Sequence, residues 1–380
     1  ITSSQALDET KNNYLLGIVY VGDVFGICAC DITTGDFLVT EVEGERELLD
    51  EIHKFAPSEI ICNEAFCMCG IDFEDLKSRY HVAISSLESR YFSDESCRKV
   101  LKEHFRVGAL DGLGLGDYDA GVLASGAVME YLYETQKNTL DHIATVQTYA
   151  TGEFMVLDTS TRRNLERLET LREKQRRGSL LWVLDKTKTA MGARLMRTLI
   201  EQPLVQRDAI LERQNAVEEL NMSYITREEI REYLNSIYDL ERLMGRISYK
   251  SANPRDLIAF GSSLKMLPHI KDLLKDMNAP LLKAIYEDLD PLKDLACLID
   301  RSIVEDPPIA VKEGGIIKDG YDQEADQLRQ AKTEGKTWLA DLEANEREKT
   351  GIKNLKIKFN KVFGYYFEVT NSFKNLVPEY

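Results

Sequence analysis

This sequence has few long apolar runs and no excess of positive charge. The longest apolar stretches, at residues 15–21 and 180–184, fall far short of the roughly 20 residues that a membrane-spanning helix needs, so we expect no membrane association. Asp and Glu number 64 against 48 Lys and Arg, which gives a formal charge of −16. This balance excludes a uniformly basic coat for nucleic acid, and any contact with a polyanion is expected to be local.

Cysteine is also sparse, and its spacing argues against disulfides and metal sites. Seven cysteines are an odd number scattered over 380 residues, which predicts reduced thiols and a cytoplasmic protein. Cys67 and Cys69 lie close to Cys62, but one residue separates the pair, whereas zinc ligands are usually separated by about two to four. We therefore predict no metal site, and we expect Cys28, Cys30 and Cys62 to fill strand positions as small hydrophobes.

The first part of the chain has the pattern of a small α/β domain, which we place at residues 1–110. Residues 14–43 alternate short β-rich runs with turn signals, which predicts a three-stranded antiparallel meander. A helix ended by Pro57 and a strand over residues 59–62 follow, and the order βββαβαβα predicts a sheet covered by helices. The glycine-rich stretch 107–118 lacks the spacing of a phosphate-binding loop and is predicted to be a flexible domain boundary.

After this boundary the apolar period becomes helical, which predicts an all-α core, or lever, domain over residues 111–320. The expected helices cover residues 119–133, 227–247 and 254–267. Pro268 is expected to end the last of these, because proline cannot continue a helix.

Residues 321–380 are assigned to a lever helix and the start of a small β domain. The helix is expected from about residue 322 to 350, with Gly351 just past its end. At about 1.5 Å per residue it would extend on the order of 40 Å, which is longer than a compact core requires. The pattern then becomes β again in the strings NLKIKFN and YYFEVT.

The residues fit two enzymatic possibilities poorly. Gly335-Lys336-Thr337 resembles the end of a P-loop, but Gln330 stands where the loop needs its first glycine. A two-metal nuclease on the N-terminal sheet would need converging carboxylates, and the best candidates are Asp23, Asp31 and Glu41. The first strand carries no acid, and turn chemistry accounts for the aspartates. We predict that this chain is not an enzyme, with the metal-dependent nuclease kept as an alternative.

Positive charge is concentrated near the end of the chain. Residues 352–374 contain five lysines and one acid, Glu368. Strand alternation places Lys356, Lys358 and Asn360 on one face, with Lys361 in the following turn. Such a face can neutralise several phosphates without reading bases. The predicted DNA backbone-binding residues are therefore Lys356, Lys358, Asn360 and Lys361. The same lysines also fit an ordinary solvated strand, since edge lysines guard against aggregation.

A second basic segment covers residues 161–177, where seven cations accompany three acids. The glutamates are interspersed with the cations, which indicates pairing on helix surfaces at spacings of three and four. We therefore interpret this segment as mainly structural.

Five strings of the sequence resemble one family. LDTSTRRNLE (157–166), followed by GSLLWVLDKTKTAMGARLMRTLIEQPL (178–204), resembles the opening of the core domain of MutS-type DNA mismatch-repair proteins. NEREKTGIKNLKIKFNKVFGYYFEVT (345–370) is similar to the entry to the MutS clamp. ALDETKNNYLLGIVY (6–20) with DITTGDF (31–37) resembles the connector domain. The resemblance covers nearly the whole chain.

This resemblance implies a multidomain α+β fragment, expected to lie within a longer protein. It implies a ribonuclease H-like connector without nuclease chemistry, a helical lever core and a partial clamp. The parent is expected to be a DNA-dependent ATPase that binds ATP and Mg, dimerises through its ATPase domain and recognises mismatched duplex DNA. This chain has no mismatch-reading wedge and no Walker motif, so no cofactor is expected in it. A MutL-type partner is expected on the connector. A purely protein-interaction helical scaffold stays a further alternative.

Overall fold

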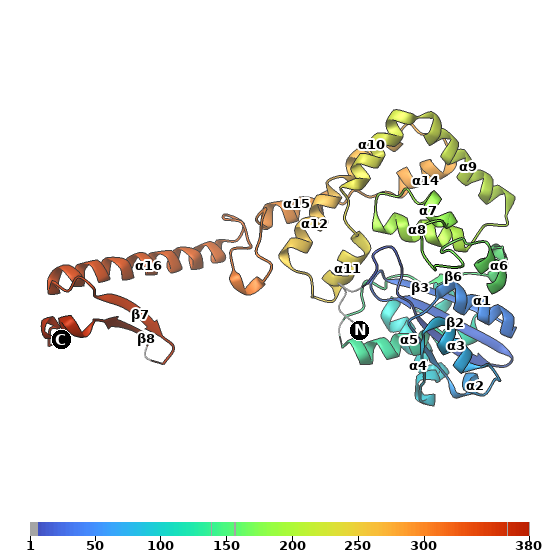
Figure 1. Cartoon of the computed structure of the whole chain (residues 1–380), viewed down its shortest axis with the longest axis horizontal. Helices are drawn as coiled ribbons and strands as arrows, with labels where there is room; N and C mark the ends of the chain where they lie inside the picture. The colour runs from blue at the N-terminus through green and yellow to red at the C-terminus, as the bar shows by residue number, and fades with distance from the viewer. Residues whose placement is uncertain (1–6, 138, 156, 363, 380) are drawn as a thin grey trace. The chain divides into compact units, whose positions relative to one another are not determined.

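A computed structural model of the chain describes residues 7–137, 139–155, 157–362 and 364–379 (Figure 1). Its packing divides it into two compact units. Unit 1 runs to Ile299 and includes Ile309–Val311, and unit 2 comprises Asp300–Pro308 and the residues from Lys312 onward. No helix in the described part of the chain is both long and apolar enough to span a membrane.

A six-stranded sheet forms the first part of unit 1, in the order β5-β4-β1-β2-β3-β6. Its strands are β1 Leu15–Val21, β2 Val24–Asp31, β3 Asp36–Val42, β4 Glu59–Cys62, β5 Ala83–Ser86 and β6 Gln147–Thr148. The first three strands are antiparallel neighbours, which confirms the predicted meander. β4 runs parallel to β1, β5 runs parallel to β4, and β6 runs parallel to β3.

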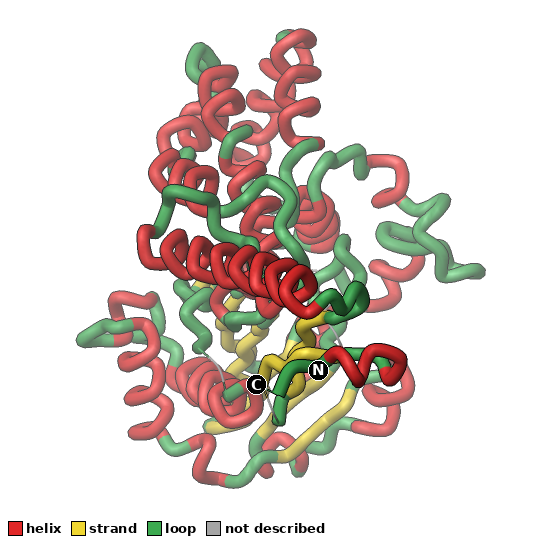
Figure 2. The backbone as a smooth tube through the Cα atoms, turned by 90° about the vertical axis from the view of Figure 1, so that its left-hand side faces the viewer, coloured by secondary structure: helices red, strands yellow, loops and turns green. Residues whose placement is uncertain are grey.

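Helices cover both faces of this sheet, which makes three layers (Figure 2). The helices of this part are α1 Glu45–Phe55, α2 Glu64–Cys67, α3 Phe73–Tyr80, α4 Asp94–Phe105 and α5 Asp119–Gln136, with short 3₁₀ turns at Ser89–Phe92 and Leu110–Leu113. Leu16 and Ile18 of β1 pack with Leu48 of α1 on one face. Leu15 and Val19 pack with α4 and α5 on the other. Because both faces are covered, β1 is apolar along most of its length.

The helix α5, which the sequence pattern assigned to the helical core, packs on the sheet instead. Small residues allow its backbone to approach closely. A Cβ on Gly26 of β2 would lie 2.1 Å from the carbonyl oxygen of Ala120, and a Cβ on Gly126 would lie 2.3 Å from the Cβ of Cys97. Since β6 adds a further strand, the packed sheet layer extends past residue 110 to Thr148.

The glycine-rich stretch before α5 differs from the expected flexible boundary. Leu110 and Leu115 are buried in the same core as α4 and α5. Gly114 adopts φ +73°, which ends the short 3₁₀ turn. Glycine accounts for this backbone conformation, and the leucines account for the packing, so the stretch is part of the sheet layer.

The rest of unit 1 is helical and has a smaller core around Ile237, Ile270, Leu274 and Leu282. Its helices are α6 Thr159–Asn164, α7 Leu180–Leu184, α8 Ala190–Glu201, α9 Arg207–Met222, α10 Tyr224–Asn235, α11 Leu240–Ser248, α12 Pro254–Leu264, α13 Leu267–Leu274 and α14 Pro280–Asp288, with α15 Lys293–Ser302 at the unit boundary and a 3₁₀ turn at Thr151–Glu153.

Two predicted helix boundaries in this region are wrong. The expected helix 227–247 is broken between α10 and α11, because Asp239 caps α11 by accepting a hydrogen bond from the Arg242 amide at 3.3 Å. Pro268 lies in the first turn of α13 and so helps to start that helix. Asn253 caps the start of α12: its side chain accepts a hydrogen bond from the Asp256 amide at 3.0 Å, and the Asp256 carboxylate accepts one from the Asn253 amide at 2.9 Å.

A buried arginine joins the sheet layer to the helices within unit 1. Arg194 of α8 is 4% exposed and donates to both carboxylate oxygens of Asp239, at 2.7 and 2.8 Å. It also donates to the Glu241 carboxylate. A further hydrogen bond, of 2.9 Å, goes to the backbone oxygen of Glu9. Arg242 donates to the backbone oxygens of residues 8 and 11. The segment that leads into β1 is therefore fixed to α8 and α11.

Unit 2 contains the long helix α16 Gln323–Thr350, the antiparallel strands β7 Lys356–Asn360 and β8 Gly364–Glu368, and 3₁₀ turns at Val311–Glu313 and Asn371–Leu376, the first shared with unit 1. Asp322 caps α16 by accepting from the Ala325 amide at 2.8 Å. Gly351 takes φ +68°, and its N–H donates to the Arg347 carbonyl. The predicted helix and its glycine end are therefore confirmed.

Candidate nucleic-acid interface

The two strands β7 and β8 form a ribbon that is rooted on the end of α16, within unit 2 (Figure 1). Ile352 and Leu355 are buried where the chain leaves the helix. The Arg347 guanidinium donates to the Leu355 carbonyl at 2.7 Å, and the Glu343 carboxylate accepts from the Ile357 amide at 2.7 Å. These two side chains also pair with each other at 2.6 Å. The helix end thus holds the first residues of β7 through two backbone groups.

The strand register places the predicted residues on one face. Lys356 lies opposite Glu368, Lys358 opposite Tyr366, and Asn360 opposite Gly364. Since side chains alternate along a strand, the lysine face carries Lys356, Lys358, Asn360, Tyr366 and Glu368. Lys361 follows directly in the turn and is exposed. Phe363 lies outside the described residues.

The opposite face of the ribbon is apolar and largely exposed. Ile357 lies opposite Phe367, and Phe359 opposite Tyr365. The rings of Phe359 and Tyr365 are in contact, with centroids 5.0 Å apart. The two faces therefore differ sharply in chemistry, as the sequence alternation predicts.

One of the lysines already has a carboxylate partner. The Lys358 ammonium lies 2.8 Å from the Glu368 carboxylate, and the two side chains are 50% and 44% exposed. The hydrogen bond that Lys358 donates to the Glu368 carboxylate raises the pKa of Lys358, which keeps the ammonium charged. Among the described residues, no carboxylate lies within 4 Å of the Lys356 or Lys361 ammonium. Lys358 must therefore exchange one anion for another in order to bind a phosphate.

Asn360 has a structural use in addition to its predicted one. Its side-chain oxygen accepts from the Val362 amide at 2.8 Å, which is an Asx turn. The NH₂ group of the same amide takes no part in this bond and can still donate. The structure therefore places all four predicted residues on or next to one face of the ribbon. Of these four, Asn360 also stabilises the turn through its side chain.

The carboxylates of the nuclease alternative do not come together. Asp23 and Asp31 flank opposite ends of β2, about 25 Å apart at about 3.3 Å per residue. Asp31 is fully buried and accepts four hydrogen bonds from Asn12, Asn13 and Thr33. Glu41 accepts from the Gly121 amide at 2.8 Å. Each of these carboxylates accepts hydrogen bonds from a nearby turn, strand or helix. Among the described residues, no group of three His, Cys, Asp or Glu could hold a metal ion.

The basic segment at residues 161–177 is used within the fold. Arg162 donates to the Leu157 carbonyl at 2.6 Å, and Arg176 pairs with Asp185. Arg167 is buried and donates to the Ile200 carbonyl at 2.5 Å; burial lowers its pKa. These contacts agree with the structural interpretation. The P-loop-like string 335–337 lies inside α16, where no phosphate loop can form.

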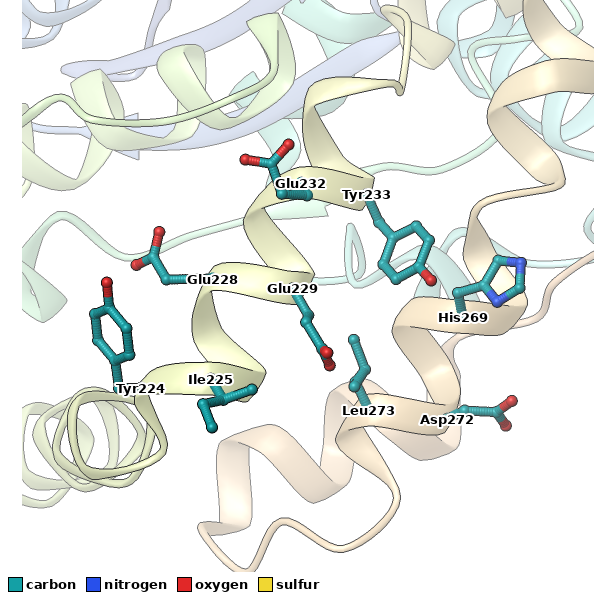
Figure 3. Close-up of a pocket in the computed structure, with 9 residues that line it drawn as sticks. All are labelled: Tyr224, Ile225, Glu228, Glu229, Glu232, Tyr233, His269, Asp272 and Leu273. Atoms are coloured by element: carbon teal, nitrogen blue, oxygen red, sulfur yellow. The ribbon is translucent and has the colours of Figure 1, made fainter.

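A depression of about 720 Å³ lies between α10 and α13 of unit 1, and its chemistry is opposite to that of the ribbon (Figure 3). It is lined by Tyr224, Ile225, Glu228, Glu229, Glu232, Tyr233, His269, Asp272 and Leu273. Four of these side chains are acids. The ring of His269 stacks on that of Tyr233 with centroids 4.9 Å apart. Such a surface repels phosphate, so it does not compete with the ribbon as a polyanion site.

A sheet layer, a helical region and a long helix that ends in a lysine-bearing ribbon define a multidomain α+β protein. The family model of MutS domain III matches residues 160–372, and that of MutS domain II matches residues 13–144. The chain belongs to the MutS family of DNA mismatch repair proteins.

Individual relatives agree with this assignment. The chain is 64% identical over 377 residues to the DNA mismatch repair protein MutS of Lachnoclostridium phytofermentans, which covers 99% of this chain and 40% of that protein. It is 48% identical to the proteins of the same name from Ruminiclostridium cellulolyticum and Acetivibrio thermocellus, over 100% of this chain and 43% and 44% of theirs. The chain thus spans about two-fifths of the length of these curated relatives.

Proposed function

We propose that this chain couples ATP-driven conformational change to the clamping of duplex DNA during mismatch recognition, as part of a MutS-type protein. In this proposal the ribbon of unit 2 holds the sugar-phosphate backbone without reading bases. The helices of the lever core transmit motion between the ribbon and the rest of the protein as units that pivot. The observation that carries the proposal is the lysine face of the ribbon, in a chain whose formal charge is −16.

The proposed contacts are charge-assisted and independent of sequence. Lys356 and Lys361 are exposed and would bind phosphate oxygens directly. Lys358 would exchange its ion pair with Glu368, whose side chain is 44% exposed, for an ion pair with a phosphate. The amide NH₂ of Asn360 would donate to a phosphate or sugar oxygen. Each lysine that is removed should weaken binding by a similar factor on any duplex sequence.

The root of the ribbon supports the transmission of force. Glu343 and Arg347 of α16 each bind a backbone group of the residues that begin β7. A tilt of the helix end would therefore move the ribbon with it. In unit 1, the Arg194 cluster fixes the segment before β1 to α8 and α11, so a movement of the sheet layer would reach the helices.

The sheet layer is proposed to be a ribonuclease H-like connector without nuclease chemistry. The antiparallel β1, β2 and β3 followed by the parallel β4 and β5 support this fold. The separation of Asp23, Asp31 and Glu41 argues against the nuclease alternative. We propose that this domain docks a MutL-type partner. The domain limits 1–110, 111–320 and 321–380 stay predictions, although α5 and β6 pack with the sheet.

The activities of the whole protein are proposals of the same kind. The relatives are named DNA mismatch repair proteins and are more than twice as long as this chain. We propose that the parent binds mismatched duplex DNA, hydrolyses ATP with Mg, forms a homodimer through its ATPase domain and works in the cytoplasm.

The test compares two triple variants of the chain on a homoduplex of random sequence at low salt. The first is Lys356→Ala/Lys358→Ala/Lys361→Ala, and the second removes the same charge from exposed lysines of unit 1, with Lys99→Ala/Lys186→Ala/Lys283→Ala. We expect the ribbon variant to lose at least tenfold in affinity while the control stays within twofold of the parent chain. Equal losses in both variants, or no loss in the ribbon variant, would contradict the proposal.

A further inference from the structure

Two cysteine sulfurs of the sheet layer lie within contact distance of each other. The Sγ atoms of Cys62 and Cys67 are 3.7 Å apart, and both cysteines are free. Cys62 is the last residue of β4 and is fully buried, whereas Cys67 is the last residue of α2 and is exposed. The pair therefore joins a thiol that solvent can reach to one that it cannot.

Hydrogen bonds place the start of α2 beside the end of β4. Cys62 pairs with Ile18 of β1 and Ser86 of β5. Asn63 accepts from the Phe66 and Tyr20 amides, both at 3.1 Å, and donates to the Tyr20 carbonyl at 3.0 Å. These bonds fix the turn between Cys62 and α2. The approach of the two sulfurs is thus a property of the fold, and it needs no rearrangement of the sheet.

We propose that Cys62 and Cys67 form a reversible dithiol–disulfide site that a small peroxide oxidises. Cys67 reacts with the peroxide first, because its thiol is exposed to solvent. Burial raises the pKa of the Cys62 thiol, which keeps that sulfur protonated and unreactive toward solvent oxidants. Cys62 then acts as the resolving thiol, since it is already adjacent.

The reaction balances in two steps. The Cys67 thiolate attacks one oxygen of hydrogen peroxide, the O–O bond breaks, and hydroxide leaves and takes up a proton as water; Cys67 becomes a sulfenic acid. The Cys62 sulfur then attacks the Cys67 sulfur, the S–O bond breaks, and the leaving hydroxide takes the Cys62 thiol proton as a second water. Two electrons pass from the sulfurs to the peroxide.

The third nearby thiol is directed elsewhere. Cys69 donates its S–H to the Phe66 carbonyl, with the sulfur 2.9 Å from that oxygen. For the disulfide to form, the sulfurs must close from 3.7 Å to about 2.05 Å. Cys62 is fixed in the sheet, so α2, a single turn with one buried residue, Phe66, supplies the movement. Oxidation would tether this turn to the end of β4.

The test treats the full chain with hydrogen peroxide, blocks free thiols, and cleaves after Glu64, which separates Cys62 from the other two cysteines. We expect the two peptides to stay linked, with a loss of two hydrogens, and to separate after reduction. Cys67→Ser should reduce linkage at least tenfold, whereas Cys69→Ser and the distant Cys297→Ser should leave it within twofold. Because Cys67 is exposed, its variant keeps the fold, which circular dichroism checks. Linkage that persists in Cys67→Ser, or Cys67 over-oxidised beside a free Cys62, would overturn the proposal.

Discussion

Arg194 offers the sharpest test of how the sheet layer is joined to the helices. The substitution Arg194→Met keeps the apolar length of the side chain and removes its charge. In the native structure Arg194 is 4% exposed and binds Asp239, Glu241 and the backbone of Glu9. Its loss leaves Asp239 with only the Arg242 amide and a guanidinium 3.9 Å away. Removing one partner of a buried pair typically costs about 3 kcal/mol of unfolding free energy.

The cost should depend on pH in a defined direction. Burial opposes ionisation of Asp239, but the hydrogen bonds from Arg194 prevail and hold the pKa of Asp239 below its ordinary value of 3.8. A group with a lowered folded pKa contributes stability above its ordinary pKa, and the contribution is lost as pH falls through the folded value. The difference between the native chain and Arg194→Met should therefore be constant above about pH 5 and shrink toward pH 3.

The assay is urea unfolding followed by far-ultraviolet circular dichroism at pH 7 and pH 3.5. Arg213→Met is the control, because Arg213 is an exposed arginine on α9, and it should change the unfolding free energy by less than about 0.5 kcal/mol. Asp239→Asn combined with Arg194→Met should cost less than the sum of the two single changes, since the two side chains act together. A loss of unfolding free energy below about 1 kcal/mol for Arg194→Met, or an equal loss at both pH values, would show that the buried pair of Arg194 and Asp239 does not stabilise the fold in this way.

Three further predictions follow from single contacts. Gly26→Ala should destabilise unit 1 by about 3 kcal/mol or more, because its Cβ would lie 2.1 Å from the Ala120 carbonyl oxygen; a urea midpoint that does not move would be inconsistent with this packing. Asn253→Ala should cost about 1 kcal/mol in the same assay, through loss of the α12 cap, whereas Asn253→Asp should restore most of it. Glu368→Gln should strengthen duplex binding at low salt by freeing Lys358, and weaker or unchanged binding would count against the ribbon as the contact surface.

The alternation in the ribbon could be predicted because the period of a strand leaves little choice. Once NLKIKFN is a strand, Lys356 and Lys358 must share a face. The ion pair between Lys358 and Glu368 could not be predicted in the same way. Glu368 lies directly opposite Lys356 in the register, and the bond is made to the diagonal neighbour, which depends on side-chain rotamers and strand twist.

The location of α5 shows a second limit. Its residues are small and apolar almost all round, which indicates a buried helix but does not say what it packs on. Its place on the sheet depends on Gly26 of β2 and on Cys97 of α4, far away in the sequence. The apolar spacing does not reveal the break at Asp239 for a related reason: the spacing continues across the break, and only the cap shows that the helix restarts.

The salt dependence of duplex binding is the most direct test of whether the lysine face of the ribbon binds the DNA backbone, because the slope of log K against log salt counts the phosphates that are neutralised. A homoduplex is titrated over a range of salt concentrations with the native chain, the ribbon variant that lacks Lys356, Lys358 and Lys361, and the control that lacks three lysines of unit 1. Each lost phosphate contact should reduce the slope of log K against log salt by about 0.9. The slope should fall by about 2 to 3 in the ribbon variant and should not change in the control. Equal slopes in all three proteins would contradict phosphate binding by the ribbon.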